Sequence, residues 1–343
     1  MWNIDFCRLN EVDQLKEFID KKWSKNHILT RCDDLLFFQH LTDDKINFLI
    51  AKDDEGNIGG ILGFILNKKY DSQIKFLDIW GAIWKVDETN PNTNGLGYLL
   101  YKYLIKTLNP DLYGALGVSQ IAMNFYKILN YKVGIMNHYY LLNDSTKSFN
   151  IAKVGINSDY KSFKDINNYT LRVVEDISCV ELKHQYKPQK TIKYLINRYK
   201  KHPVYNYIFM GIYRENVIVS IFVCRKIDIN NSGCFRIVDI YGNIDNIDGS
   251  IFSQLQDFLK NEKAEYIDCI NFGIDDSIFN KIGFEKLDHE GKTIIPNYFE
   301  PFEQRNIQLE FAYKSNYENV VIFKGDSDQD RPNDIEISYD EKY

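Results

Sequence analysis

Basic side chains are in the minority in this sequence: 42 lysines and arginines stand against 48 aspartates and glutamates, and the basic residues form no long run. Binding to nucleic acid or to an anionic membrane is therefore not expected, because both need a concentrated basic surface. A small anionic substrate remains allowed. Residues 1–6 lack the basic and apolar regions of a secretory signal, and no stretch approaches the roughly 20 apolar residues that span a bilayer. We expect a soluble, cytoplasmic protein.

Patterns for metal ions and disulfides are also lacking. The six cysteines show no C-x-x-C spacing, and the histidines show no partner spacing for a metal. The segment Asp326-x-Asp328-x-Asp330 has the spacing that begins a calcium loop, but Arg331 stands where the turn glycine of such a loop belongs. We expect neither a disulfide framework nor a metal site.

A chain of 343 residues with 44% hydrophobic side chains is long enough for two cores. Residues 143–165 are polar and of mixed character, which predicts a boundary between a first domain over 1–145 and a second over 165–343. Hydrophobic spacing and turn residues predict the elements of the first domain: a short strand, a helix over 10–23, strands over 46–52, 58–66 and 74–86, a helix over 96–108, a strand over 113–118, a helix from the Ser119 cap to 129, and a strand over 131–142.

The second half repeats this plan. The pattern predicts a helix that ends near 201, strands over 205–213, 217–225 and 234–241, a helix with one apolar face over 251–259, and a strand over 266–272. The two halves share this order rather than obvious residue identity. A tandem duplication is the interpretation that the order favours.

Glycines lie where a central strand of the first half gives way to a helix, in Asn92-Thr93-Asn94-Gly95-Leu96-Gly97. The main-chain N–H groups of such a turn offer positive potential to phosphates, and glycine lets the main chain approach them closely. The segment resembles the R/Q-x-x-G-x-G/A pyrophosphate loop of the GNAT family of N-acetyltransferases. Asn92 departs from the family pattern and removes a cationic contact.

A second segment, Ala-Met-Asn-Phe-Tyr-Lys-Ile-Leu-Asn-Tyr over 122–131, resembles the family's A-x-x-[FL]-Y-x-x-[LH]-G-F signature, with Asn130-Tyr131 in place of Gly-Phe. In the family, the tyrosine at the place of Tyr126 hydrogen-bonds the coenzyme sulfur and protonates the departing thiolate. A phenol suits this role, because its pKa of about 10 is close to that of an alkyl thiol. A core aromatic is the competing interpretation of Tyr126.

The resemblance implies an α/β (α+β) fold of two tandem GNAT-like domains, each a mixed, mostly antiparallel sheet flanked by helices. The first would be the catalytic domain that binds acetyl-CoA, and a neutral amine would attack the thioester directly while a strand N–H steadies the oxyanion. By resemblance, acetyl-CoA is held by the strand residues Trp84, Lys85 and Val86, by the turn residues Asn92, Thr93, Asn94, Gly95, Leu96, Gly97 and Tyr98, and by Asn124.

The resemblance does not fix the general base, for which Asp78, Glu88, His40 and His138 are candidates. Asp78 lies on a strand from which it can face a substrate cleft, and the pKa of a histidine suits proton transfer. A solvated carboxylate and a buried core histidine are the competing interpretations. We take Tyr126, Asp78 and His138 as the catalytic set.

The second half lacks a G-x-G turn: residues 242–249 carry two aspartates that would repel phosphate. Residues 278–284 resemble a worn form of the family's helix-to-strand signature. This half is therefore expected to be a degenerate repeat that binds substrate or supports the first, and assembly into a homodimer is left open.

The segments 295–302 and 325–333 resemble the ends of two-domain GNAT proteins associated with bacterial surface-polysaccharide synthesis. This resemblance implies that the acceptor is an amino sugar carried on a nucleotide, with Arg331, Lys324 or Arg305 meeting a phosphate unless the tail is simply solvated. The leading hypothesis is acetyl transfer to such a sugar. A tRNA-dependent aminoacyl transferase, which the negative charge disfavours, and a catalytically silent GNAT-like binding module remain as alternatives.

Overall fold

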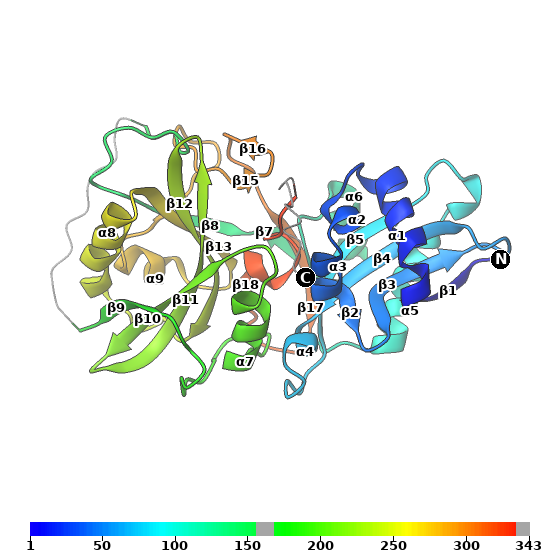
Figure 1. Ribbon diagram of the computed structural model, residues 1–343, viewed down its shortest axis with the longest axis horizontal. Coiled ribbons are helices and arrows are strands. Elements are labelled where there is room, and N and C mark those ends of the chain that lie inside the picture. The colour runs from blue at the N-terminus through cyan, green and yellow to red at the C-terminus, as the bar shows by residue number, and fades with distance from the viewer. Residues whose placement is uncertain (156–167, 334–343) are drawn as a thin grey trace, which may run out of the picture.

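The computed structural model describes residues 1–155 and 168–333 and contains two large sheets that lie side by side (Figure 1). The first has the strand order β1-β3-β4-β5-β6-β17-β7, with β2 paired to β3. Its strands are β1 (Asn3–Arg8), β2 (Leu41–Thr42), β3 (Lys45–Lys52), β4 (Ile58–Leu66), β5 (Asp78–Val86), β6 (Leu112–Leu116), β7 (Lys132–Ile135) and β17 (Glu310–Ser315). The helices of this half are α1 (Val12–Phe18), α2 (Ile28–Arg31), α3 (Asp33–His40), α4 (Asn67–Tyr70), α5 (Leu96–Leu108) and α6 (Gln120–Ile128).

The second sheet has the order β14-β8-β13-β12-β11-β10-β9, with β18 paired to β13. Its strands are β8 (Asn137–Leu142), β9 (Thr170–Val174), β10 (Tyr207–Arg214), β11 (Val217–Ile229), β12 (Ser232–Gly242), β13 (Ala264–Phe272), β14 (Glu285–Lys286) and β18 (Ile322–Phe323). The helices α7 (Ile192–Leu195), α8 (Phe252–Asn261) and α9 (Asp276–Lys281) belong to this half, and a small hairpin joins β15 (Tyr298–Phe299) to β16 (Phe302–Glu303).

The two sheets are built alike, which confirms the expected pair of mixed, mostly antiparallel sheets. Each contains one parallel pair, β5 with β6 and β12 with β13, and the other neighbours are antiparallel. The helix after the first strand of each parallel pair, α5 or α8, buries leucines at helical spacing against its sheet. The fold class predicted from the sequence is therefore correct.

The predicted strand over 131–142 is wrong, because this segment forms two strands in different sheets. Met136 separates β7 from β8, and its N–H donates to the carbonyl of Leu309, the residue before β17. Strand β8 inserts between β13 and β14 of the second sheet, and β17 from the far end of the chain inserts between β6 and β7 of the first. The sheets therefore exchange one strand each, β8 and β17.

Local sequence rules explain the helices that position the site. Gly95 adopts a left-handed conformation with φ of 77° and starts α5, and Asn109 ends it in the same region with φ of 43°. The hydroxyl of Ser119 accepts a hydrogen bond from the N–H of Ala122 at 3.3 Å, so it caps α6 as predicted.

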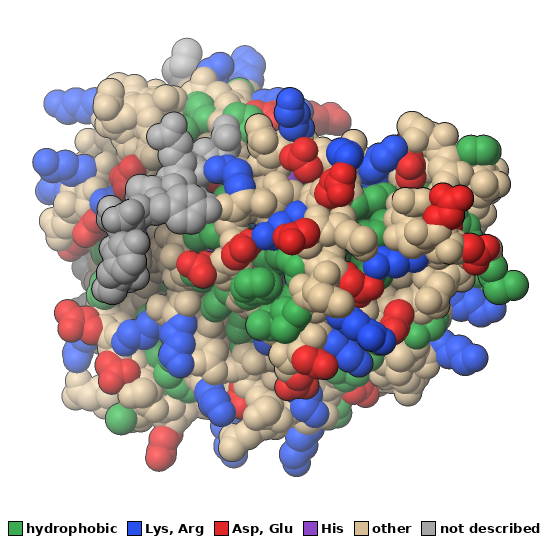
Figure 2. Space-filling model, turned by 45° about the vertical axis from the view of Figure 1, so that its right-hand side comes forward, with side chains coloured by type: hydrophobic (Ala, Val, Ile, Leu, Met, Phe, Trp, Pro, Cys, Tyr) green, Lys and Arg blue, Asp and Glu red, His purple; other side chains and the backbone are tan. Residues whose placement is uncertain are grey.

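The surface carries mixed charge. On the face in Figure 2, acidic and basic side chains are interspersed rather than gathered into one basic patch. Among the residues that the structure describes, no helix is long and apolar enough to cross a bilayer.

Candidate functional site

The parallel strands β5 and β6 separate at one point. They pair from Asp78 with Leu112 to Gly81 with Ala115, and β5 then continues to Val86 without β6. We call the gap beyond this last pair the first fork. Gly81 leaves room there for a phenol, because a Cβ atom on it would lie 2.6 Å from the hydroxyl oxygen of Tyr113.

Four tyrosines fill the base of the first fork. The hydroxyl oxygens of Tyr113 and Tyr126 lie 3.3 Å apart, and those of Tyr101 and Tyr131 lie 2.6 Å apart. Tyr126 is buried, and burial raises its pKa above the usual value of a phenol. The phenol of Tyr126 is therefore a weaker acid in this setting than the sequence alone indicates.

Trp84 lies on β5 beyond the last residues that pair with β6, and its ring contacts two aromatic side chains of α6. Its ring centroid is 5.2 Å from that of Phe125 and 6.0 Å from that of Tyr126. The indole also borders the turn, because its nitrogen lies 3.4 Å from the place of a Cβ atom on Gly97. In this structure, aromatic side chains line the path from the glycine turn to Tyr126.

The glycine turn itself is open. Thr93 anchors it, since the hydroxyl of this buried residue donates to the carbonyls of Asp87 and Asn90, both at 2.8 Å. A Cβ atom on Gly95 would meet no atom of the described chain within 4 Å. The first turn of α5 has no side-chain cap, so the N–H groups of Leu96, Gly97 and Tyr98 emerge at the helix end.

The other residues expected around acetyl-CoA have mixed placements. Asn92 and Asn124 are exposed, and the carbonyl of Asn92 accepts a hydrogen bond from the indole of Trp2 at 2.9 Å. Lys85 forms an ion pair with Glu88 at 2.7 Å. Val86 pairs with Gly60 of β4 at the end of β5.

The second sheet has an equivalent fork, and the chain itself fills it. Strands β12 and β13 pair from Gly233 to Ile237 and then part. Strand β18 pairs with the freed part of β13, and the turn over 324–326 follows it. Gly325 lies so close to β12 that a Cβ atom on it would be 2.6 Å from the carbonyl oxygen of Val238. This second fork is therefore closed to a ligand by the tail.

The tail is held in the second fork by buried charges. The Lys190 ammonium lies 2.6 Å from a carboxylate oxygen of Asp239 on β12 and 2.7 Å from one of Asp326. All three side chains are buried. Asp239 also accepts a hydrogen bond from the Tyr199 hydroxyl at 2.8 Å. The neighbouring carboxylates raise the pKa of Lys190 despite its burial, so it is charged at neutral pH.

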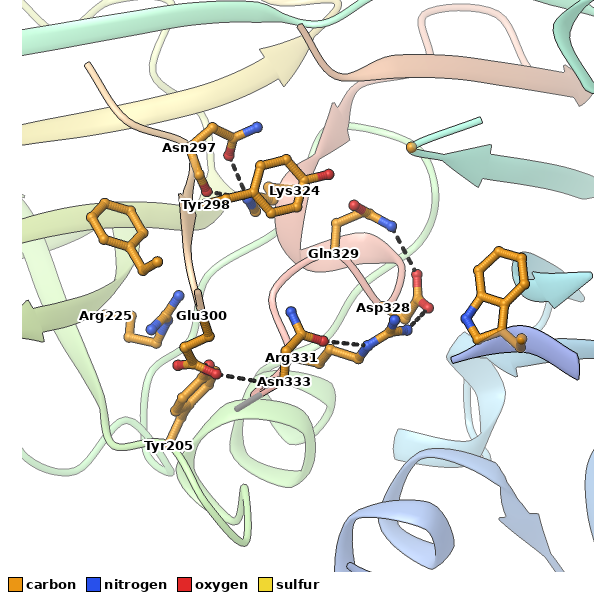
Figure 3. A pocket seen from close by; sticks show the side chains of 13 residues that line it. Tyr205, Arg225, Asn297, Tyr298, Glu300, Lys324, Asp328, Gln329, Arg331 and Asn333 are labelled. Atoms are coloured by element: carbon orange, nitrogen blue, oxygen red, sulfur yellow. Dashed lines mark hydrogen bonds and ion pairs between the residues drawn. The ribbon is translucent and has the colours of Figure 1, made fainter. Parts of the chain in front are cut away.

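A polar pocket lies where the two halves meet (Figure 3). Its cavity has a volume of about 220 Å³. Both carboxyl-terminal motifs line it, the first with residues 297–300 and the second with Asp328, Gln329, Arg331 and Asn333, and Lys324, just before the second motif, lines it too. Tyr205 and Arg225 contribute from the second half, and Trp23 and Gly117 from the first, where Gly117 follows the end of β6. We call this cavity the junction pocket.

Similarity in three dimensions agrees with this geometry. No family model matches the sequence, and no curated protein matches it significantly. A GCN5-related N-acetyltransferase from Anabaena variabilis superimposes with a TM-score of 0.54 over 92% of this chain and 73% of its own, at 10% identity. A conserved Enterococcus faecalis protein described as a probable N-acyltransferase gives a TM-score of 0.53 over 84% of this chain and 70% of its own, at 11% identity. The chain has the GNAT fold.

In terms of the GNAT fold, the structure brings together the glycine turn, the first fork and Tyr126, but not the expected base. Asp78 lies at the start of β5, three residues and roughly 10 Å along the strand from Gly81. It is buried and accepts a hydrogen bond from the Tyr317 hydroxyl at 2.7 Å, and burial raises its pKa to about 6. The proposed grouping of Asp78 with Tyr126 is not found: Ile79 packs in the same core cluster as Tyr126, and the alternation of the strand turns Asp78 to the other face of the sheet with Trp80.

His138 is likewise not part of the first fork. It lies on β8 in the second sheet, where its ring nitrogen is 2.8 Å from Asp268. Burial lowers its pKa. His40 is buried in the first half with its pKa lowered to about 3, again by burial. The prediction that His138 belongs to the first site is wrong, because β8 crosses to the other sheet.

Several pocket residues were missed in the sequence. Tyr205, Arg225 and Trp23 reach the junction pocket from three separate elements, and no local pattern marks them. The three aspartates of the calcium-like spacing have protein partners instead: Asp326 with Lys190, Asp328 with Arg331, and Asp330 with Arg225. Within residues 1–155 and 168–333, no group of three or more potential ligands could hold a metal ion.

Proposed function

We propose that this chain is a GNAT-type N-acyltransferase that uses acetyl-CoA as acyl donor and works in the cytoplasm. The observation that carries the proposal is the first fork: an uncapped glycine turn at one end and a buried tyrosine at its base, in the order that the GNAT fold places them. The second fork is filled by the tail, so one donor site per chain is expected.

The residues of the first fork have distinct tasks in this proposal. The N–H groups of Leu96, Gly97 and Tyr98 bind the diphosphate. The phenol of Tyr126 donates a hydrogen bond to the sulfur as the thiolate leaves. The acceptor amine must arrive neutral, and we assign its proton to water, since neither Asp78 nor His138 lies at the fork.

For the acceptor, we propose an amino sugar carried on a nucleotide, in surface-glycan biosynthesis. The junction pocket supports this proposal through its polar, charged lining, which suits a hydrophilic ligand better than an apolar one. Its position beside the end of β6 is next to the first fork. A thiol-release screen against a panel of amino-sugar nucleotides tests both donor and acceptor. Activity only with peptide or polyamine acceptors contradicts the sugar assignment.

The second candidate is a catalytically silent GNAT-like module. The aromatic contacts of Trp84 favour it, because the indole occupies space along the path to Tyr126. Calorimetry with acetyl-CoA separates the two candidates. Absence of heat at millimolar acetyl-CoA favours the silent module.

Gly97→Asp is expected to weaken acetyl-CoA binding by at least about tenfold, because it places a carboxylate against the diphosphate. Thermal stability should stay equal or rise, since an acidic residue suits the first turn of a helix. Calorimetric titration measures the first effect, and a melting curve the second. Lys102→Gln is the matched control: it changes the net charge by the same amount at an exposed position of α5. Equal affinities of the Gly97→Asp variant and the parent contradict the proposed turn.

Trp84 is expected to report donor binding directly. If the pantetheine arm enters the first fork, the indole must move away from Phe125, and its emission should change. The chain has four tryptophans, so the test compares the parent with Trp84→Phe under acetyl-CoA titration. Because the indole of Trp2 contacts the glycine turn and responds as well, the parent should show a saturable change larger than that of the variant. The same change in both proteins means that the arm does not displace Trp84.

A further inference from the structure

The junction pocket contains a buried amine with no acidic partner. Lys324 is 3% exposed, and its ammonium nitrogen contacts the main-chain carbonyl of Asn297 at 3.2 Å and the side-chain oxygen of the same residue. Among the described residues, no carboxylate forms an ion pair with it. Figure 3 shows Lys324 and Asn297 facing each other at one end of the pocket.

The other charged side chains around Lys324 already form ion pairs with one another. Arg225 pairs with Asp330 at 2.8 Å, and the guanidinium of Arg236 donates to Asp268 at 2.9 Å. Arg236 also donates to the carbonyl of Asn297 at 3.0 Å, so this carbonyl serves two cationic groups. Burial, together with the charge of Arg236, holds the pKa of Lys324 well below its usual value.

A second donor, beside Lys324, has no hydrogen-bond acceptor among the described residues. Asn297 is 2% exposed, and its side-chain nitrogen makes no hydrogen bond within the described chain, while its oxygen accepts from Lys324. Buried donors without partners cost stability, and the same residue lines the cavity. The pocket thus presents a buried amine whose oxygen acceptors in the described chain are uncharged, beside an amide N–H that has no acceptor there.

We propose that the junction pocket is an oxyanion subsite, in which Lys324 and the amide of Asn297 bind a phosphate or carboxylate group of the acceptor. An oxyanion supplies the missing negative charge and accepts from both donors, so it satisfies the two groups at once. Anion binding at this subsite does not depend on the proposed function. Only the identity of the molecule that carries the anion, the acceptor, rests on it.

The other basic candidates do not fit this role. Arg331 lines the pocket but pairs with Asp328. Arg305 is exposed, pairs with Glu303 at 2.6 Å and does not line the pocket. Of the three residues proposed from the sequence to meet a phosphate, the structure selects Lys324.

The test is calorimetric titration of the full chain with inorganic phosphate and, separately, with malonate. Lys324→Met should weaken binding of the preferred anion by about 10- to 100-fold, the loss of one charge-assisted hydrogen bond. Arg305→Met, which removes the same charge from an exposed site, should bind like the parent. Asn297→Asp should also lose binding while its unfolding midpoint stays equal or rises, because the new carboxylate fills the subsite and pairs with Lys324.

The outcomes are distinct. Preference for phosphate indicates a phosphorylated acceptor, and preference for malonate a carboxylated one. The subsite is overturned if the parent binds neither anion at 10 mM, which is about ten times a millimolar Kd. It is also overturned if Lys324→Met binds the anion as tightly as the parent. Because phosphate can also reach the glycine turn, Gly97→Asp is titrated in parallel and should keep the Lys324-dependent binding. A chain that binds acetyl-CoA but no oxyanion overturns the subsite alone. Lys324-dependent anion binding without acetyl-CoA binding overturns the acyltransferase proposal alone.

Discussion

Tyr126→Phe is expected to lower kcat for acetyl transfer by about a hundredfold, with the affinity for acetyl-CoA unchanged within a factor of about three. The phenol hydroxyl lies at the base of the first fork, 3.3 Å from that of Tyr113, where the sulfur of a bound donor would arrive. A donor to the departing thiolate acts mainly in the transition state, so its loss lowers kcat more than binding. Steady-state kinetics and calorimetry measure the two quantities.

A loss of about a hundredfold in kcat lies at the lower end of the range for the loss of a general acid. Burial raises the pKa of Tyr126, so the phenol gives up its proton less readily than a solvated one. The same shift means that kcat should not fall through ionisation of Tyr126 up to about pH 10. Tyr113→Phe is the matched control, since it removes the neighbouring hydroxyl and should affect kcat much less. A Tyr126→Phe enzyme with parental turnover removes this residue from the mechanism.

Lys190→Met is expected to lower the free energy of unfolding by about 3 to 5 kcal/mol, the cost of leaving buried charges unpaired. The substitution removes the cationic partner of two buried carboxylates, Asp239 and Asp326, whose oxygens lie 2.6 and 2.7 Å from the ammonium. Because Asp326 belongs to the tail that closes the second fork, local release of the tail should precede global unfolding. Urea denaturation measures the first effect, and hydrogen exchange near residues 320–326 the second.

The control for this prediction lies close in sequence. Lys193 has a side chain that is 57% exposed and pairs with Asp71 at 3.6 Å, so Lys193→Met should cost less than about 1 kcal/mol. Adding Asp326→Asn to Lys190→Met should recover part of the lost stability, because one of the two unpaired charges disappears. A loss from Lys190→Met no larger than that from Lys193→Met contradicts the structural role of the buried group.

The second fork shows how the carboxyl-terminal half differs from a half that binds coenzyme. The sequence lacks a G-x-G turn over 242–249. In the structure, β18 and the turn over 324–326 occupy the gap between β12 and β13. The same tail continues into the junction pocket, so one segment closes one fork and lines the pocket.

The sequence by itself determined the elements whose signals are local. The apolar spacing of α5, the left-handed Gly95 that starts it and the Ser119 cap of α6 each depend on neighbours within a few residues. The strands over 45–52 and 58–66 were found to within one residue for the same reason. The GNAT fold was predicted from the resemblance of two short motifs, over 92–97 and 122–131, to that family.

Only the tertiary structure decided which strands pair and which distant side chains meet. The alternation of a strand says which face is buried, but not which sheet receives it, so the crossing of β8 and the return of β17 left no mark in the sequence. That exchange is why His138 lies away from Tyr126. The junction pocket arises in the same way: Lys324 and Asn297 are 27 residues apart and become neighbours because the tail folds back through the second fork.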